Sequence, residues 1–192
     1  MYKQIFSGWR KALVAAGLLV GLMGAQASVE AISLQEIQSD EQMVQVGYAN
    51  NQVVYVKRDT IGVIPQWHPY YATIGDTYLL DVNNQTIEKA QTTFFYNLGF
   101  TGSYFAARVK ASYLNLTQET LMQKVMELKA KDSGIKARFK KREMYKFDGT
   151  PVEASLPDMK NKQVVPVATA MYKAGDKIYE MVYGVNFDSL MP

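Results

Sequence analysis

Short alternating runs of apolar and polar residues, separated by pairs of asparagines, constrain the fold of this chain more than any other feature of its sequence. The first two runs are residues 43–48 and 53–57, and Asn50-Asn51 lies between them. Asparagine tolerates the positive φ that a tight turn between antiparallel strands requires. The spacing therefore predicts a β-hairpin.

A longer hairpin is predicted from residues 77–82 and 86–97, which flank Asn83-Asn84. In a strand, every second side chain points to the same face of the sheet. Four residues of the longer run share one face: Ala90, Thr92, Phe94 and Tyr96. The other face takes Lys89, Gln91, Thr93 and Phe95. This alternation is typical of a strand with one buried face.

Residues 104–113 also alternate, and they predict another strand. Five of them fall on one face: Phe105, Ala107, Val109, Ala111 and Tyr113. Gly99-x-x-Gly102 comes just before this run. A glycine pair that precedes a strand is interpreted as a turn, because a phosphate-binding loop opens a helix.

Residues 117–131 predict a helix instead. Thr117 is a suitable N-cap, and Ser133-Gly134 would end the helix. Apolar residues recur in it at three- and four-residue spacing: Leu121, Met122, Val125, Met126 and Leu128. We expect this apolar stripe to pack on a sheet.

A basic strand is predicted around residues 136–146, closed by a turn at Asp148-Gly149. The expected apolar face takes Ala137, Phe139, Tyr145 and Phe147, and the opposite face takes Lys136, Arg138, Lys140, Arg142 and Lys146. After a stretch punctuated by prolines, Asp176 is expected to cap a short last helix. That helix would place Ile178, Met181, Val182 and Val185 on one side.

The strands outnumber the helices and are joined locally, so we predict an α+β fold. Its centre is expected to be a meandering antiparallel sheet of about six strands, with one main helix packed on it and a short C-terminal helix. The predicted organisation is a signal peptide at residues 1–27, a leader segment or short helix at residues 28–41, and a single domain at residues 42–192.

The N-terminal segment has the order of a cleavable secretory signal. Lys3, Arg10 and Lys11 precede the uncharged apolar residues 12–23, and Ala25-Gln26-Ala27 supplies the small residues expected before a cut at Ser28. The apolar stretch is shorter than the roughly 20 residues that a spanning helix needs. We therefore expect export by the general secretory route to the periplasm, the cell surface or the medium, with no transmembrane helix after cleavage.

Loss of that segment changes the charge balance. Three of the 21 Lys and Arg residues lie in it, so 18 remain against 18 Asp and Glu. A formally neutral chain gives no global electrostatic case for nucleic-acid binding. The chain contains no cysteine, so stability must come from the core, and a domain of this length can bury enough surface to supply it.

Two pairs of stretches carry a family resemblance: VGYANNQVVYVKRDTIGV with DVNNQTIEKAQTTFFYN, and MYKFDGTPVEAS with VVPVATAMYKAGDKIYEMVYG, all within residues 43–187. They resemble the bacterial surface-adhesin E-like domains. The chain departs from that pattern at Lys57, where the family has Asp, in an insertion at residues 65–76, and in lacking the cysteines of some members. The resemblance implies a six-stranded antiparallel sheet, an exported or surface setting and, for adhesin members, binding of matrix and plasma proteins.

The sequence contains no recognisable catalytic or metal-binding motif. His68 is the only histidine, and its proline-bounded loop has no nucleophile motif nearby. A zinc site would lack both Cys and a second His. Asp76 and Asp81 lie in turn-forming surroundings and are interpreted as surface acids. We therefore predict a protein that is not an enzyme and uses no cofactor.

Residues 124–146 contain nine Lys and Arg residues against three Asp and Glu. Six of them form the candidate face for an anionic ligand: Lys136, Arg138, Lys140, Lys141, Arg142 and Lys146. Such a face suits envelope glycans, lipid headgroups or heparin-like chains. The alternative interpretation is a solvated sheet face on which lysines protect an edge.

An aromatic loop is the second candidate contact region. Trp67, Tyr70 and Tyr71 are amphipathic rings of the kind found at interfaces, although the same residues would also serve to anchor the loop to the core. The leading hypothesis is thus an exported, non-enzymatic binding or adhesion-type domain, with an envelope polymer or an extracellular protein as its partner. An envelope accessory protein without its own ligand is the alternative, and an unrecognised enzyme is a third possibility.

Overall fold

The computed structural model of the chain describes residues 32–113, 115–152 and 156–188. The predicted signal segment and its cut at Ser28 lie outside these residues. The described elements are α2 (Leu34–Ser39), β1 (Met43–Ala49), β2 (Gln52–Lys57), η1 (Arg58–Thr60), β3 (Gly62–Ile64), β4 (Tyr70–Asp81), β5 (Thr86–Asn97), η2 (Leu98–Phe100), α3 (Gly102–Ser112), α4 (Gln118–Lys131), β6 (Ile135–Lys146), β7 (Gln163–Val164) and α5 (Ala170–Tyr183).

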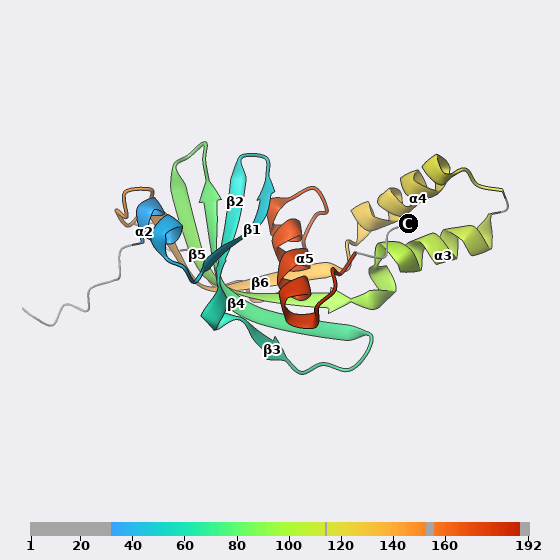
Figure 1. Cartoon of the computed structure of the whole chain (residues 1–192), viewed down its shortest axis with the longest axis horizontal. Coiled ribbons are helices and arrows are strands. Elements are labelled where there is room, and N and C mark those ends of the chain that lie inside the picture. Colours follow the sequence, from blue (N-terminus) through green and yellow to red (C-terminus); the bar gives the residue numbers. More distant parts are fainter. Residues whose placement is uncertain (1–31, 114, 153–155, 189–192) are drawn as a thin grey trace, which may run out of the picture. The chain divides into compact units, whose positions relative to one another are not determined.

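The predicted α+β fold is confirmed, with an antiparallel sheet at its centre (Figure 1). The strand order is β1-β2-β4-β5-β6-β7, and β3 pairs with β4. The described residues form seven strands where about six were expected, because β3 and β7 are short additions to the sheet. None of the described helices is long and apolar enough to cross a membrane.

Both predicted hairpins are present. Asn50 and Asn51 have φ of 52° and 59° between β1 and β2, as the turn chemistry requires. In the second hairpin the carboxylate of Asp81 accepts hydrogen bonds from the backbone N–H groups of Asn83 and Asn84. Strand β4 begins earlier than predicted, because the second half of the 65–76 segment extends it and pairs with β5.

The helix that covers the sheet is α5, and not the helix of residues 117–131 as predicted. Thr169 caps α5 through a bond from the N–H of Tyr172, so Asp176 lies inside the helix instead of starting it. The helix crosses β1 at Gly47, where an added Cβ would lie 2.1 Å from the carbonyl oxygen of Ala170. Its buried face meets the face of β5 that carries Phe94 and Tyr96.

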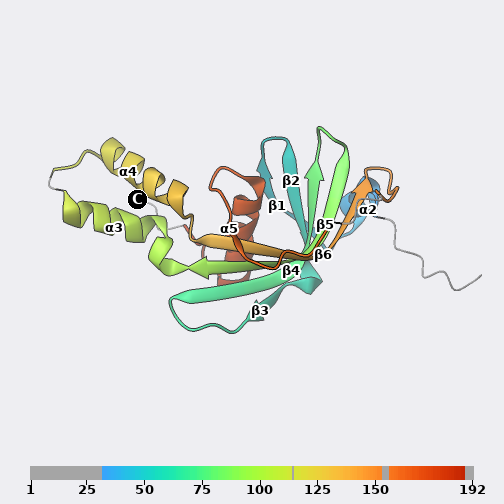
Figure 2. The same ribbon diagram turned by 180° about the vertical axis from the view of Figure 1, so that it is seen from behind.

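Residues 104–112 belong to helix α3 (Gly102–Ser112), with Tyr113 as its C-cap, and not to the predicted strand. Thr101 caps this helix, and Phe105 and Val109 are buried one turn apart, whereas Ala107 and Ala111 are exposed. Alternating alanines fit either period, so helix propensity and packing decide the outcome. As Figures 1 and 2 show, α3 and α4 form a helical hairpin, with a small core of its own that includes Leu121 and Val125.

The other face of the sheet is covered at one end by α2, the short helix predicted for the leader segment. Ser33 and Glu36 form a capping box at its start. Ile37 is buried against β4 and β5, in a second cluster that includes Ile87 and Tyr145. The sheet is therefore covered by helices on both faces, each at a different place.

Candidate anion-binding face

A β-bulge divides the predicted basic row of β6. Lys89 lies opposite Glu143 and Gln91 opposite Lys140, so β6 carries one residue more than β5 between these pairs. Lys141 is the extra residue of the bulge, and its φ is 50°. Because the alternation of a strand has period two, one extra residue reverses the face of every residue beyond it.

The prediction of one continuous row was therefore wrong. Lys136, Arg138 and Lys140 share the face of β5 that carries Phe95, whereas Arg142 and Lys146 share the opposite face. Phe139 and Tyr145, expected on one side, also lie on opposite faces. Periodicity could not reveal this, because nothing in the composition of residues 140–142 marks a bulge.

The six basic residues of the predicted face differ in their ion pairing and in their exposure to solvent. Arg142 Nε lies 2.7 Å from Glu88 Oε1, and Lys136 Nζ lies 3.3 Å from an oxygen of Asp132. Lys140, Lys141 and Lys146 are exposed. The most open charges thus lie near the bulge and at the end of the strand.

Arg138 adjoins Phe95 on the face away from α5. Its guanidinium carbon lies 5.6 Å from the ring centroid of Phe95, and Nζ of Lys162 lies 5.0 Å from the same centroid. Nε of Arg138 is buried and has no hydrogen-bond partner in the described part of the chain. A buried donor without a partner costs about 1–3 kcal/mol.

The two sequence candidates meet at a pocket of about 220 Å³ on this face. Tyr70 from the aromatic loop lines it together with Lys136, Lys162 and Phe95. The sheet register explains the meeting, because Tyr70 pairs with Asn97 and Phe95 pairs with Lys136. We call the surface made by Tyr70, Phe95, Lys136, Arg138, Lys140 and Lys162 the cationic face. The sequence prediction missed Phe95 and Lys162, and Lys162 lies in a proline-rich stretch that carries no strand pattern.

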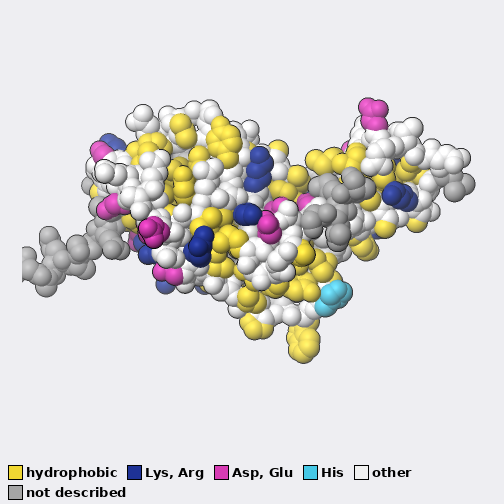
Figure 3. Space-filling view, in the orientation of Figure 1, with side chains coloured by type: hydrophobic (Ala, Val, Ile, Leu, Met, Phe, Trp, Pro, Cys, Tyr) yellow, Lys and Arg dark blue, Asp and Glu magenta, His cyan; other side chains and the backbone are white. Residues whose placement is uncertain are grey.

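The aromatic loop splits into exposed and packed residues. Trp67 is 90 % exposed and Tyr70 is 53 % exposed. Figure 3 shows hydrophobic side chains standing out at the end of the β3–β4 hairpin. Tyr71 instead packs edge-on against Tyr179 and Tyr183 of α5, at centroid distances of 6.0 and 5.2 Å. Tyr71 is thus part of the core, and Trp67 and Tyr70 are the residues available for contact.

His68 lies exposed in the same loop. Within residues 32–113, 115–152 and 156–188, no group of three or more His, Asp or Glu side chains is placed to hold a metal ion.

Lys129, counted in the basic segment of the sequence, is buried instead. It is 1 % exposed, and its Nζ donates to the carbonyl oxygens of Phe100 and Ser133 at 3.2 and 2.6 Å and to Asp188 Oδ1 at 2.9 Å. Burial lowers the pKa of Lys129, and the charge of Asp188 opposes that shift. The burial of Lys129 could have been predicted from its position, because residues 121, 125 and 129 recur every four residues and form the buried stripe of α4.

Asp188 also corrects the interpretation of the glycine pair. Gly102 opens α3 and not a strand, and its N–H donates to Asp188 Oδ1 at 3.0 Å. The hydroxyl of Tyr172 donates to the other oxygen of the same carboxylate. The start of α3 is therefore occupied by a carboxylate of the chain itself, and this cluster holds the helical hairpin to the C-terminal segment.

Comparison with protein-family models, with curated proteins and with solved structures finds no significant match. The function must therefore be argued from the cationic face itself. The resemblance to surface-adhesin E-like domains stays a prediction.

Proposed function

We propose that the protein is an exported, non-enzymatic binding domain, and that its ligand is an anionic polymer held along the cationic face. The observation that carries the proposal is the pocket in which Tyr70 and Phe95 lie beside Lys136 and Lys162. Cations next to the exposed ring of Tyr70 and the half-buried ring of Phe95 suit a ligand with both a flat, weakly polar surface and negative charge. An acidic glycan chain has both properties.

The geometry of β6 favours an extended ligand. Lys136, Arg138 and Lys140 are alternate residues before the bulge, so they recur at about 7 Å along the strand. A chain laid along β6 would meet them in succession, and Arg138 would offer its terminal N–H groups to a carboxylate or sulfate. The opposite side of the sheet, which α5 covers, is the side shown in Figure 3. On that side Lys and Arg are scattered among Asp and Glu.

Export is supported by the order of charges and apolar residues in residues 1–27. The alternative, an envelope accessory protein without a ligand, is favoured by the ion pair between Lys136 and Asp132, which partly neutralises the face. The two proposals differ in whether isolated protein retains an anionic polymer at physiological salt.

Binding of heparin, used as the probe polymer, tests the proposal. The variant Arg138→Gln with Lys140→Gln should weaken binding about tenfold or more and reduce its salt dependence. The control Lys110→Gln with Lys146→Gln removes the same charge from other exposed sites and should change binding little. Equal loss in both variants would show attraction to overall charge only, and no binding by the wild-type protein would favour the accessory role.

A further inference from the structure

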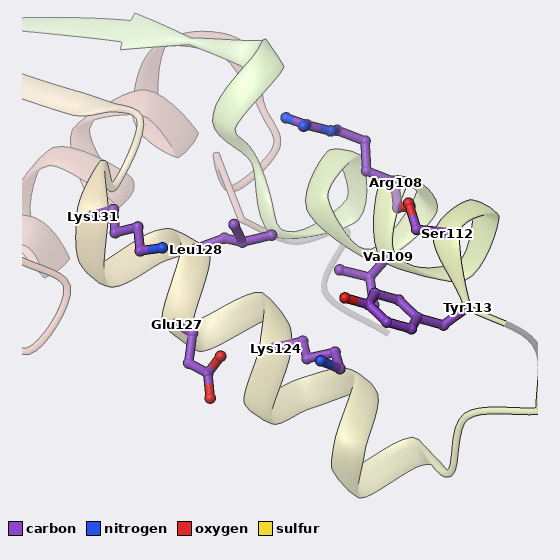
Figure 4. Close-up of a pocket in the computed structure, with 8 residues that line it drawn as sticks. All are labelled: Arg108, Val109, Ser112, Tyr113, Lys124, Glu127, Leu128 and Lys131. Carbon is purple, nitrogen blue, oxygen red and sulfur yellow. The ribbon is translucent and has the colours of Figure 1, made fainter.

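The helical hairpin contains a groove of about 280 Å³ between α3 and α4 (Figure 4). Its floor is apolar. Val109 and Tyr113 project from α3 toward α4, and Leu128 projects back from α4. Val109 is buried, whereas Tyr113 is 50 % exposed. The groove therefore has a recessed apolar floor that is open to solvent on one side.

Helical spacing explains why these residues line it. On α4, residues 124, 128 and 131 recur at three- and four-residue spacing and lie on the groove side. Residues 121, 125 and 129 form the neighbouring stripe and are buried. The groove thus lies beside the buried stripe of α4, and its floor is the solvent-facing edge of the hairpin core, since Val109 belongs to that core and Leu128 packs against it.

Three cations line the groove: Arg108, Lys124 and Lys131. The guanidinium carbon of Arg108 lies 5.9 Å from the ring centroid of Tyr104 and points away from α4, so Lys124 and Lys131 are the cations beside the floor (Figure 4). None of the three forms an ion pair with a carboxylate of the described residues. Lys124 Nζ instead lies 4.4 Å from the ring centroid of Tyr113. The only acid of the lining, Glu127, accepts a hydrogen bond from Gln123 and points away from α3 (Figure 4).

We propose that this groove binds an acidic amphipathic segment of a partner protein. The groove would take one or two aliphatic side chains on its apolar floor. Its volume of about 280 Å³ lies just below the range of about 300–1,000 Å³ that small-molecule sites have. The cationic rim would pair with Glu or Asp beside them, in the helix-in-groove mode. A lipid surface fits less well, since a bilayer is met by protruding apolar side chains and Val109 is recessed.

The site is separate from the cationic face and does not rest on the proposed polymer ligand. Lys124 and Lys131 belong to α4, whereas Lys136, Arg138 and Lys140 belong to β6. Each can therefore be removed while the other is retained.

The probe is a fluorescent helical peptide with Leu at positions i, i+4 and i+7 and Glu at the flanking positions. Its binding to the full chain is measured by anisotropy, beside the same peptide with Lys in place of Glu. We expect binding of the Glu peptide alone. Lys124→Glu with Lys131→Glu should weaken it about tenfold or more. Tyr113→Ala should also weaken it, and the circular dichroism of both variants should match the wild type.

The control variant Lys140→Glu with Lys146→Glu makes the same charge change outside the groove. It should leave peptide binding unchanged and reduce heparin binding, which separates this inference from the proposed function. No binding of the Glu peptide, or equal binding by the groove variant, would overturn the inference. Binding of phosphatidylglycerol vesicles that depends on Lys124 and Lys131, without peptide binding, would assign the groove to a lipid surface instead.

Discussion

Lys129 Nζ lies 2.8 Å from Asp188 Oδ2, and both side chains are almost completely buried. The pair joins α4 to the segment that follows α5. Because Asp188 also accepts hydrogen bonds from Gly102 and Tyr172, one carboxylate holds α3, α4 and α5 together. The helical hairpin has a small core of its own, and this cluster is one of the contacts that join it to α5 and the C-terminal segment.

Breaking that ion pair should destabilise the fold strongly. Lys129→Met leaves a buried carboxylate without its cation, and we expect the free energy of unfolding to fall by about 3–5 kcal/mol in urea titrations. Lys131→Met, two residues along the same helix, should change it by no more than about 0.5 kcal/mol. If both variants are equally stable, the buried pair does not fix the hairpin.

Gly47 should tolerate no larger residue. Gly47→Ala puts a Cβ against the carbonyl oxygen of Ala170, so α5 must move, and we expect a loss of about 1–3 kcal/mol or more on thermal or chemical unfolding. Gly62→Ala is the matched control, because its Cβ would be 3.4 Å from Ile74 and in ordinary contact. A loss of the same size at Gly62 would mean that α5 does not determine the effect at Gly47.

The bulge predicts opposite effects of glycine at neighbouring positions. Lys141→Gly relieves a left-handed backbone conformation that costs a non-glycine residue about 1–2 kcal/mol, so the variant should be more stable than wild type. Lys140→Gly lies in ordinary strand and should be less stable by roughly 0.5–1 kcal/mol. The free energy of unfolding of each variant is measured by denaturant titration. A loss of stability in Lys141→Gly would contradict the left-handed backbone conformation of Lys141.

Stability should fall at alkaline pH through buried tyrosines. Burial and the hydrogen bond to Glu143 raise the pKa of Tyr145 to about 12 from an ordinary value of 10.0, and burial raises that of Tyr179 to about 12. A raised pKa contributes stability in full below pH 10 and loses it as the pH rises toward 12.

The variant Tyr145→Phe should therefore show a shallower decline of the unfolding free energy between pH 10 and 12 than the wild type. Denaturant titrations across this interval measure the slope, and tyrosinate absorbance measures ionisation directly. The exposed Tyr113→Phe is the control and should keep the wild-type slope. Equal slopes for wild type and Tyr145→Phe would show that Tyr145 ionises without unfolding.

Local turn chemistry made the hairpins predictable, because Asn50 and Asn51 carry their conformational preference in the sequence itself. The helix at residues 104–113 was missed, since its alanines fit either period and only the packing of Phe105 and Val109 distinguishes them. The covering helix was assigned wrongly for a related reason. Both α4 and α5 carry apolar stripes, and which of them meets the sheet depends on long-range contacts at Gly47.

The candidate site was predictable only in part. Lys136, Arg138 and Lys140 were placed on one face by alternation, as found. Phe95 was placed on one face with Lys89, Gln91 and Thr93, but only the β5–β6 register shows that it lies beside Lys136. Lys162 comes from a segment more than 15 residues beyond β6, and its approach to Phe95 is a tertiary contact that no local pattern encodes.

Odd-numbered residues of β6 pack into two different cores because the bulge at Lys141 lies between them. Before it, Ile135 and Ala137 of β6 pack toward α5, and beyond it Tyr145 packs toward α2 on the opposite side. Deletion of this single residue would leave Arg142 alone opposite Ala90, so the β5–β6 ladder would become regular while Tyr145 stayed opposite Ile87 in the α2 cluster. Among homologues, chains with and without this one residue should therefore keep the packing of both α5 and α2 on β6.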